Sequence, residues 1–143
     1  MFTPVKHLAF AAAITCVSFP AGAQNAEPEE ARTTYQITFI ELADGADDRW
    51  MEILTENTNP ARQVAGLPLP TVHWLVNGPW DLMLVTEMPD GMAALDSHNP
   101  RTVTAYRAAL QQRMGSEAAV DALTKEMDAL VAGSDRMFSH THP

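Results

Sequence analysis

The stretch that decides the fold is residues 67–88, LPLPTVHWLVNGPWDLMLVTEM. It contains two apolar runs that are separated by Asn-Gly-Pro at positions 77–79. Asn-Gly between two apolar runs is typical of a β-hairpin. A two-residue loop at positions 78–79 would place His73 opposite Leu84. We therefore expect residues 67–88 to form two antiparallel strands.

Alternation of side chains along these strands assigns them to two faces of a sheet. With this register, one face carries His73, Leu75, Asn77, Trp80, Leu82, Leu84 and Thr86. The other face carries Val72, Trp74, Val76, Asp81, Met83, Val85 and Glu87. Apolar side chains occupy the middle of both faces, so we expect both faces to be covered.

The segments before the hairpin predict a strand and then a helix. Residues 33–42, TTYQITFIEL, are rich in β-branched and aromatic residues that alternate with polar ones, which indicates a strand. Residues 47–66 have apolar side chains at helical spacing, acidic residues in the first turn and Gly66 at the end. Pro60 removes a backbone donor from this helix, so the helix should kink or restart there.

The segments after the hairpin predict two helices and a short strand. Residues 89–100 form a connection with about one helical turn, and Asn99-Pro100 is typical of a helix start. The helix that follows should end at Gly115. Ser116 should cap another helix that ends at Gly133, with a short strand in the remaining residues.

This order of elements predicts an α+β fold with the ferredoxin-like β-α-β-β-α-β pattern and one extra C-terminal helix. Helices cover only one sheet face in that pattern, whereas both faces of the expected hairpin are apolar. The element order, the size and the second apolar face of residues 33–140 resemble the dimeric α+β barrel superfamily. The resemblance implies a homodimer that pairs sheet against sheet, with the ligand site between the sheet and the helices.

Members of that superfamily include small monooxygenases and haem-handling enzymes, so the resemblance allows an oxygenase-like activity. Haem-degrading members use an Asn, Trp and His trio, and the chain has these residue types at Asn77, Trp80 and His98. The asparagine of those members lies on the first strand, where this chain has Gln36 and Thr38. We therefore do not expect haem degradation, and the sequence identifies no cofactor; a transition metal or haem stays open.

The first 23 residues have the layout of a secretory signal peptide. Lys6 provides the positive charge, an apolar run follows, and Ala21-Gly22-Ala23 is typical of a cleavage site. We expect a signal peptide over residues 1–23, a flexible linker over 24–32 and a single domain over 33–143. The protein would then be periplasmic or secreted, and the mature chain would lack a disulfide because the one cysteine is Cys16.

The charge of the mature chain excludes some partners. The chain has 18 acidic and 9 basic residues, and removal of Lys6 changes the net charge from −9 to −10. Such a chain repels phosphate backbones and anionic lipids, so we expect neither nucleic-acid binding nor stable membrane insertion after cleavage.

Four residues are candidates for catalysis: His73, Trp80, Asp96 and His98. Trp and His often line ligand clefts, although large aromatic side chains also anchor ordinary sheets. Asp96 is two residues from His98 and could orient its imidazole through one ring nitrogen. The other ring nitrogen could then act as a general base or as a ligand. Helix capping explains the same Asp-Ser-His-Asn run equally well.

His140 and His142 are candidates for metal binding, because alternate residues of an extended segment point the same way. A polar tail is the simpler alternative. Phe138 should pack against the domain and hold this tail in place. The cations best placed for an anionic ligand are Arg49, Arg62, Arg101 and Arg107, and salt bridges with the many acidic residues are the default expectation for them.

Three functions follow from these observations. The leading one is an exported small-molecule-binding protein or small enzyme with a cleft that bears His73, Trp80 and His98. The second is a histidine-based metal-binding or accessory protein without turnover. The third is a structural dimer module. The sequence does not decide whether the protein is an enzyme.

Overall fold

A computed structural model describes residues 32–142. The expected signal peptide, and all of the expected linker except Arg32, lie outside the described residues. The strands are β1 (Thr34–Leu42), β2 (Thr71–Trp74), β3 (Leu82–Glu87) and β4 (Val131–His140). The helices are α1 (Asp47–Ile53), the π-helix η1 (Leu54–Thr58), α2 (Asn59–Val64), the 3-10 helix η2 (Gly91–Asp96), α3 (Arg101–Met114) and α4 (Glu117–Ala129).

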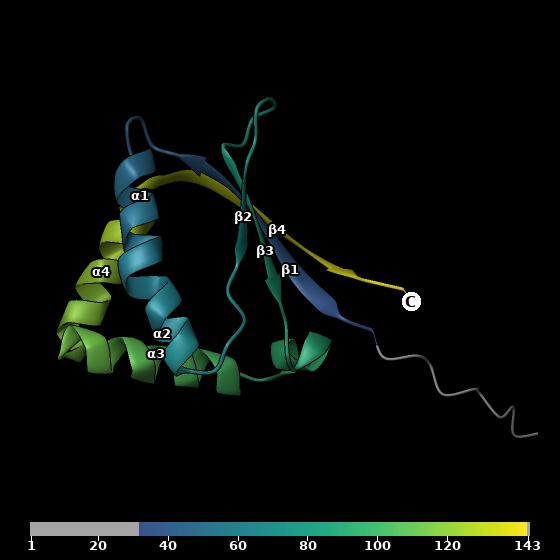
Figure 1. The fold of residues 1–143 in the computed structure, drawn as a ribbon, viewed down its shortest axis with the longest axis vertical. Coiled ribbons are helices and arrows are strands. Elements are labelled where there is room, and N and C mark those ends of the chain that lie inside the picture. Colours follow the sequence, from purple (N-terminus) through teal and green to yellow (C-terminus); the bar gives the residue numbers. More distant parts are fainter. Residues whose placement is uncertain (1–31, 143) are drawn as a thin grey trace, which may run out of the picture.

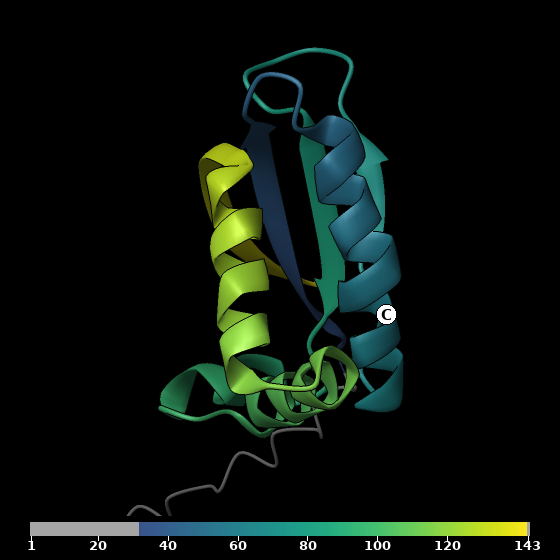
Figure 2. The ribbon, with the colours of Figure 1, turned by 90° about the vertical axis from the view of Figure 1, so that its left-hand side faces the viewer.

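The four strands form one antiparallel sheet in the order β2-β3-β1-β4. Helices α1, α2 and α4 lie on one side of this sheet, and α3 crosses its base (Figure 1, Figure 2). The element order and the sheet order confirm the predicted α+β, ferredoxin-like fold with an extra helix.

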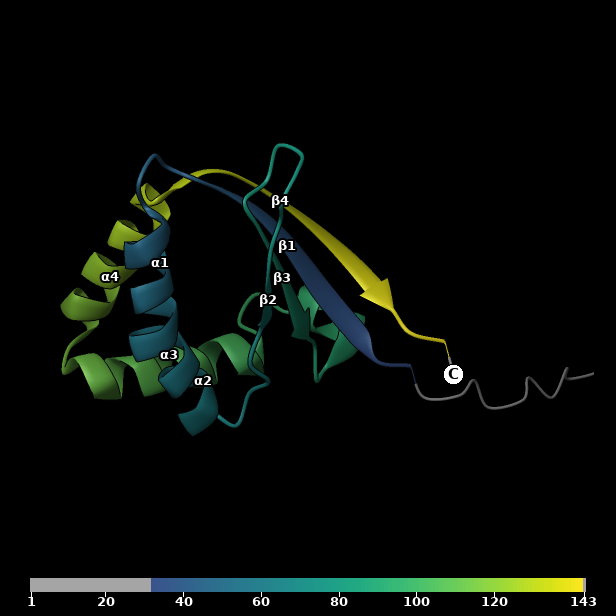
Figure 3. The ribbon, with the colours of Figure 1, turned by 45° about the horizontal axis from the view of Figure 1, so that its top comes forward.

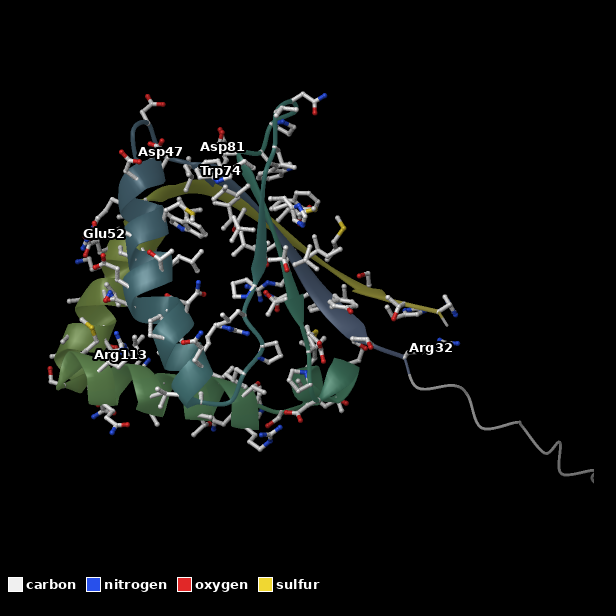
Figure 4. All side chains as sticks on the ribbon, viewed as in Figure 1. Arg32, Asp47, Glu52, Trp74, Asp81 and Arg113 are labelled. Carbon is white, nitrogen blue, oxygen red and sulfur yellow. The ribbon has the colours of Figure 1, made fainter. Side chains whose placement is uncertain are left out.

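The helix before the hairpin contains the irregularity that Pro60 predicts. Segments α1, η1 and α2 follow one another without a break, and the π-helix ends at Thr58, two residues before Pro60. Pro60 has no N–H, so it cannot bond the carbonyl of Glu56 four residues earlier. Arg113 of α3 donates to that carbonyl oxygen instead, at 2.9 Å. Figure 4 labels Arg113 near the lower end of the helices.

Two groups of buried side chains form the core. The first joins α1 and η1 to the sheet and contains Ile40, Trp50, Leu54 and Leu82. The second joins the helices to one another and contains Ile53, Ala61, Ala109, Leu110, Val120 and Leu123. The first group holds α1 and η1 against the end of the sheet that carries the hairpin loop.

The predicted hairpin register is wrong by one residue. His73 pairs with Met83 rather than Leu84, and the connection spans residues 75–81. Asp81 explains the longer loop, because its N–H bonds the Ile40 carbonyl at 2.9 Å and its carboxylate accepts from the Leu42 N–H at 2.8 Å. A one-residue shift moves every β2 side chain to the opposite face, so His73 lies on the side away from the helices.

The second half of the chain confirms the caps but not all of the boundaries. The Ser116 hydroxyl accepts from the Ala119 N–H at 3.2 Å, and Gly115 has a φ of +82°. Helix α3 begins at Arg101, one residue later than Asn99-Pro100 predicts. Helix α4 ends at Ala129 rather than at Gly133, because β4 begins at Val131 and pairs along the full length of β1.

The sheet has one face without helices, and this face is apolar in its middle, with polar residues such as His73 and Glu87 toward its edges. By alternation and register it carries Tyr35, Ile37, Phe39, Met83, Val85 and Met137. Figure 3 shows the helices on the other side only. Within residues 32–142, no helix covers this face. No helix of this part of the chain is long and apolar enough to cross a membrane.

Candidate functional site

A cavity of about 300 Å³ lies between the sheet and the segments α2, η2 and α3. Its floor is the paired residues Gln36 of β1 and Thr86 of β3, which lie on the helix-bearing face. The volume is at the lower end of the range of about 300–1,000 Å³ that is typical of small-molecule sites. The cavity therefore suits a compact ligand.

The walls combine apolar and polar side chains. The main apolar ones are Leu67, Met88, Ala94, Leu95 and Val103. The polar residues outside the floor are Arg62 of α2, Tyr106 of α3 and Arg136 of β4, together with Thr102, Asp90 and Glu87, whose side chain points away from the cavity. A mainly apolar wall with a few convergent polar groups is the common composition of a ligand site.

Arg62 is half-buried and is held by the backbone of the segment that follows α2. Its Nε donates to the carbonyl oxygen of Pro68 at 2.8 Å. Burial lowers the pKa of Arg62, and the nearby Tyr106 opposes this shift. An arginine pKa starts so high that the guanidinium still stays protonated. The cavity wall therefore contains a partly desolvated positive charge.

The other three arginines predicted to meet anions are all in salt bridges. Arg49 bonds Glu126 at 2.7 Å, Arg101 bonds Asp90 at 2.7 Å and Arg107 bonds Asp121 at 2.7 Å. These hydrogen bonds raise the pKa of Arg49 and Arg107 and lower the pKa of Glu126. Within residues 32–142, Arg62 has no carboxylate within salt-bridge distance.

The two acidic residues in the cavity wall do not neutralise Arg62. Asp90 is paired with Arg101 at 2.7 Å. Glu87 pairs with Tyr35 in the sheet, and alternation directs its side chain to the face without helices. The positive charge of the cavity is thus not balanced from within the described domain.

The four predicted catalytic residues lie in three places, and none lines the cavity. His73 is exposed on β2, on the helix-free face. Trp80 lies in the hairpin loop with its ring centroid 6.2 Å from that of Phe39. Asp96 and His98 are exposed at the connection between η2 and α3. The structure does not bring these four side chains into one cleft, and a catalytic role for them stays a prediction.

His140 and His142 are close to each other at the end of β4. Their Nε2 atoms are 3.1 Å apart, and both side chains are exposed. The segment is held in place, because the Thr141 N–H donates to the Thr33 carbonyl at 3.0 Å. Phe138 is less well packed than predicted, with 38% of its surface exposed, since it lies on an edge strand. The part of the chain that the structure describes holds no cluster of three or more metal-ligating side chains.

The sequence interpretation missed most of the cavity. Gln36 and Thr86 are polar residues at helix-facing positions of β1 and β3, and this polarity is a local signal that could have identified them. Arg136 and Tyr106 carry no comparable signal. The cavity residues come from five separate segments that meet only in the folded chain.

Comparison with models of protein families and with curated proteins gives no match. Among solved structures, a NIPSNAP family protein of unknown function from Agrobacterium tumefaciens has a TM-score of 0.50 and 13% identity, over 76% of this chain and 87% of that one. A second NIPSNAP family protein from the same organism has a TM-score of 0.47 and 12% identity, over 76% and 91% of the two chains. A NIPSNAP domain protein from Burkholderia xenovorans has a TM-score of 0.46 and 11% identity, over 74% and 91%. At 13% identity, the similarity to the first of these structures shows a shared α+β, ferredoxin-like fold and no activity.

Proposed function

We propose that this protein binds a small organic molecule in the cavity between the sheet and helices α2 and α3. The observation that carries the proposal is the cavity itself, in which apolar walls surround the half-buried Arg62. The proposal concerns binding. An oxygenase-like reaction has no support from the cavity walls, whose lining residues include neither histidine nor cysteine within the described domain.

The proposal includes a homodimer of the dimeric α+β barrel type in an exported protein. The apolar, helix-free sheet face supports the dimer, because isolated domains rarely expose such a surface. The charged, apolar and small-residue segments of positions 1–23 support export. The cavity lies on the opposite side of the sheet, so a sheet-to-sheet dimer would leave it open.

A bulky side chain in the cavity tests the binding site. Val103 lines the cavity and is 56% exposed, so Val103→Trp should fill the space without loss of the core. Benzoate and benzyl alcohol serve as small anionic and neutral probes, and binding is measured by calorimetry. We expect saturable binding of at least one probe to the wild type, and at least about tenfold weaker binding to the variant.

Val64→Trp is the matched control, because Val64 is 63% exposed on α2 and does not line the cavity. It should bind the probes as the wild type does. The proposal fails if neither probe binds the wild type, or if Val103→Trp binds as tightly as Val64→Trp.

The histidine pair supports a second candidate function, metal binding without turnover. Two nitrogens that are each about 2.0–2.1 Å from a tetrahedral zinc ion are about 3.3–3.4 Å apart. The 3.1 Å separation of the two Nε2 atoms is close to this bite. Two imidazoles would leave the remaining coordination positions to water or to a second molecule.

Titration of the untagged protein with Zn(II) and Cu(II) tests this candidate. We expect His140→Ala to abolish the tightest binding step, because a single imidazole cannot chelate. His98→Ala, which removes an exposed histidine outside the pair, should change nothing. Equal metal affinity of His140→Ala and the wild type would show that the pair is not a metal site.

A further inference from the structure

We propose that the ligand of this cavity is a small organic anion, a carboxylate on a compact apolar body, and that Arg62 binds its charged group. This inference rests on the proposed function, because it assigns a chemical class to the molecule in the same cavity. It depends on the environment of the Arg62 side chain, on its neighbours and on the shape of the cavity.

The guanidinium of Arg62 is positioned but largely unused. A guanidinium has five N–H donors, and one of them, on Nε, is bonded to the Pro68 carbonyl at 2.8 Å. No acceptor within residues 32–142 bonds its two Nη groups. The bond from Nε fixes the plane of the group, so the Nη donors are oriented before a ligand arrives. Such a fixed fork matches the two oxygens of a carboxylate.

Partial burial together with the lack of a counterion distinguishes Arg62 among the Arg and Lys side chains of residues 32–142. The chain has twice as many acidic as basic residues, and Arg49, Arg101 and Arg107 all bond carboxylates. A half-buried charge without a partner is unfavourable, because it has lost part of its hydration. An anion in the cavity would replace that hydration with two charge-assisted hydrogen bonds.

The neighbours of Arg62 add to the positive character. Arg136 of β4 also lines the cavity, and it has no carboxylate within salt-bridge distance in the described domain. Its neighbour Asp135 accepts a hydrogen bond from the backbone N–H of Arg136 at 2.8 Å, not from the guanidinium. Tyr106, whose hydroxyl donates to the Thr58 hydroxyl at 3.5 Å, also lines the cavity. Two guanidinium groups and a phenol therefore border one space.

The apolar wall limits the rest of the ligand. Leu67, Leu95 and Val103 line the same cavity, whose volume is about 300 Å³. This surface suits a ring or a short aliphatic chain and leaves no room for a large cofactor. A compact carboxylate satisfies both the charged and the apolar parts of the wall.

A purely structural role for Arg62 is the competing explanation. Its Nε bond to Pro68 and the bond from the Leu67 N–H to its carbonyl oxygen, at 2.9 Å, both brace the segment after α2. A brace would affect stability and would weaken the binding of every ligand equally. A charge-recognition role affects anions alone, so paired probes of equal shape separate the two.

The experiment compares benzoate with benzyl alcohol on the wild type, Arg62→Gln, Arg62→Lys and Arg136→Gln. The wild type should bind benzoate more tightly. Arg62→Gln should weaken benzoate binding about 10- to 100-fold and leave benzyl alcohol unchanged. Arg62→Lys should recover part of the loss, because it keeps the charge but not the fork. Arg136→Gln should have a smaller effect, and Arg107→Gln, which removes an arginine outside the cavity, should have none.

The possible results separate this inference from the proposed function. If benzyl alcohol binds as tightly as benzoate, and Arg62→Gln affects both or neither, the anion inference is wrong and the proposed cavity stands. If neither probe binds the wild type, both the anion inference and the proposed function are wrong. If Arg62→Gln does not fold, Arg62→Lys decides: weaker benzoate binding with unchanged benzyl alcohol binding supports the inference, and equal loss of both overturns it.

Discussion

Replacement of Ile37 by arginine should convert the proposed dimer to a monomer. Ile37 lies in the middle of β1, between Val85 of β3 and Met137 of β4, on the face that has no helices. A sheet-to-sheet dimer would bury this position, and an unpaired charge there is strongly unfavourable. We expect the dimer to weaken by about 3 kcal/mol or more, which is a factor of at least about 100 in Kd.

Sedimentation velocity at micromolar concentration measures this effect. Val64→Arg is the control, because it places the same charge on an exposed position of α2 and should leave the dimer intact. A wild-type protein that sediments as a monomer would contradict the dimer. A dimer that survives Ile37→Arg would contradict the choice of face.

The second large effect concerns Trp50, the anchor between α1 and the sheet. Trp50 is 1% exposed and packs in one cluster with Ile40, Leu54 and Leu82. Trp50→Ala removes a large buried side chain and leaves a cavity, which costs about 3–5 kcal/mol of the free energy of unfolding. Domains are commonly stable by only about 5–15 kcal/mol, so the variant should be close to unfolding.

Trp74→Ala is the matched control for this prediction. Trp74 is 53% exposed at the end of the edge strand β2. Figure 4 labels its side chain close to Asp81. Its removal should cost about 1 kcal/mol or less. Urea denaturation of both variants measures the difference, and equal destabilisation would contradict the assignment of the core.

The sequence predicts the elements of this fold better than their boundaries. Local signals predicted a helix irregularity at Pro60 and the caps at Gly115 and Ser116, because each depends on the chemistry of one or two residues. The hairpin register, by contrast, depends on a contact with a distant part of the chain. Asp81 bonds the backbone of β1 through Ile40 and Leu42, and this contact with a distant segment outweighs the preference for a two-residue loop.

The cavity could not be predicted from the sequence for a related reason. Arg62 was one of four equivalent candidates until the structure showed which acidic residues lie beside the other three. Salt bridges such as Arg49 with Glu126 join residues that are 77 positions apart, so no local pattern predicts them. The residues chosen for their chemistry, such as His73 and His98, lie on separate surfaces.

The location of a bound probe decides whether the cavity is the ligand site. Titration of the ¹⁵N-labelled wild-type protein with benzoate, followed through its amide signals in NMR spectra, gives this location. Saturable changes should be largest around the cavity residues Gln36, Thr86 and Tyr106. Changes centred instead on His73 and Trp80, or no saturable change at any amide, would contradict a ligand site between the sheet and the helices.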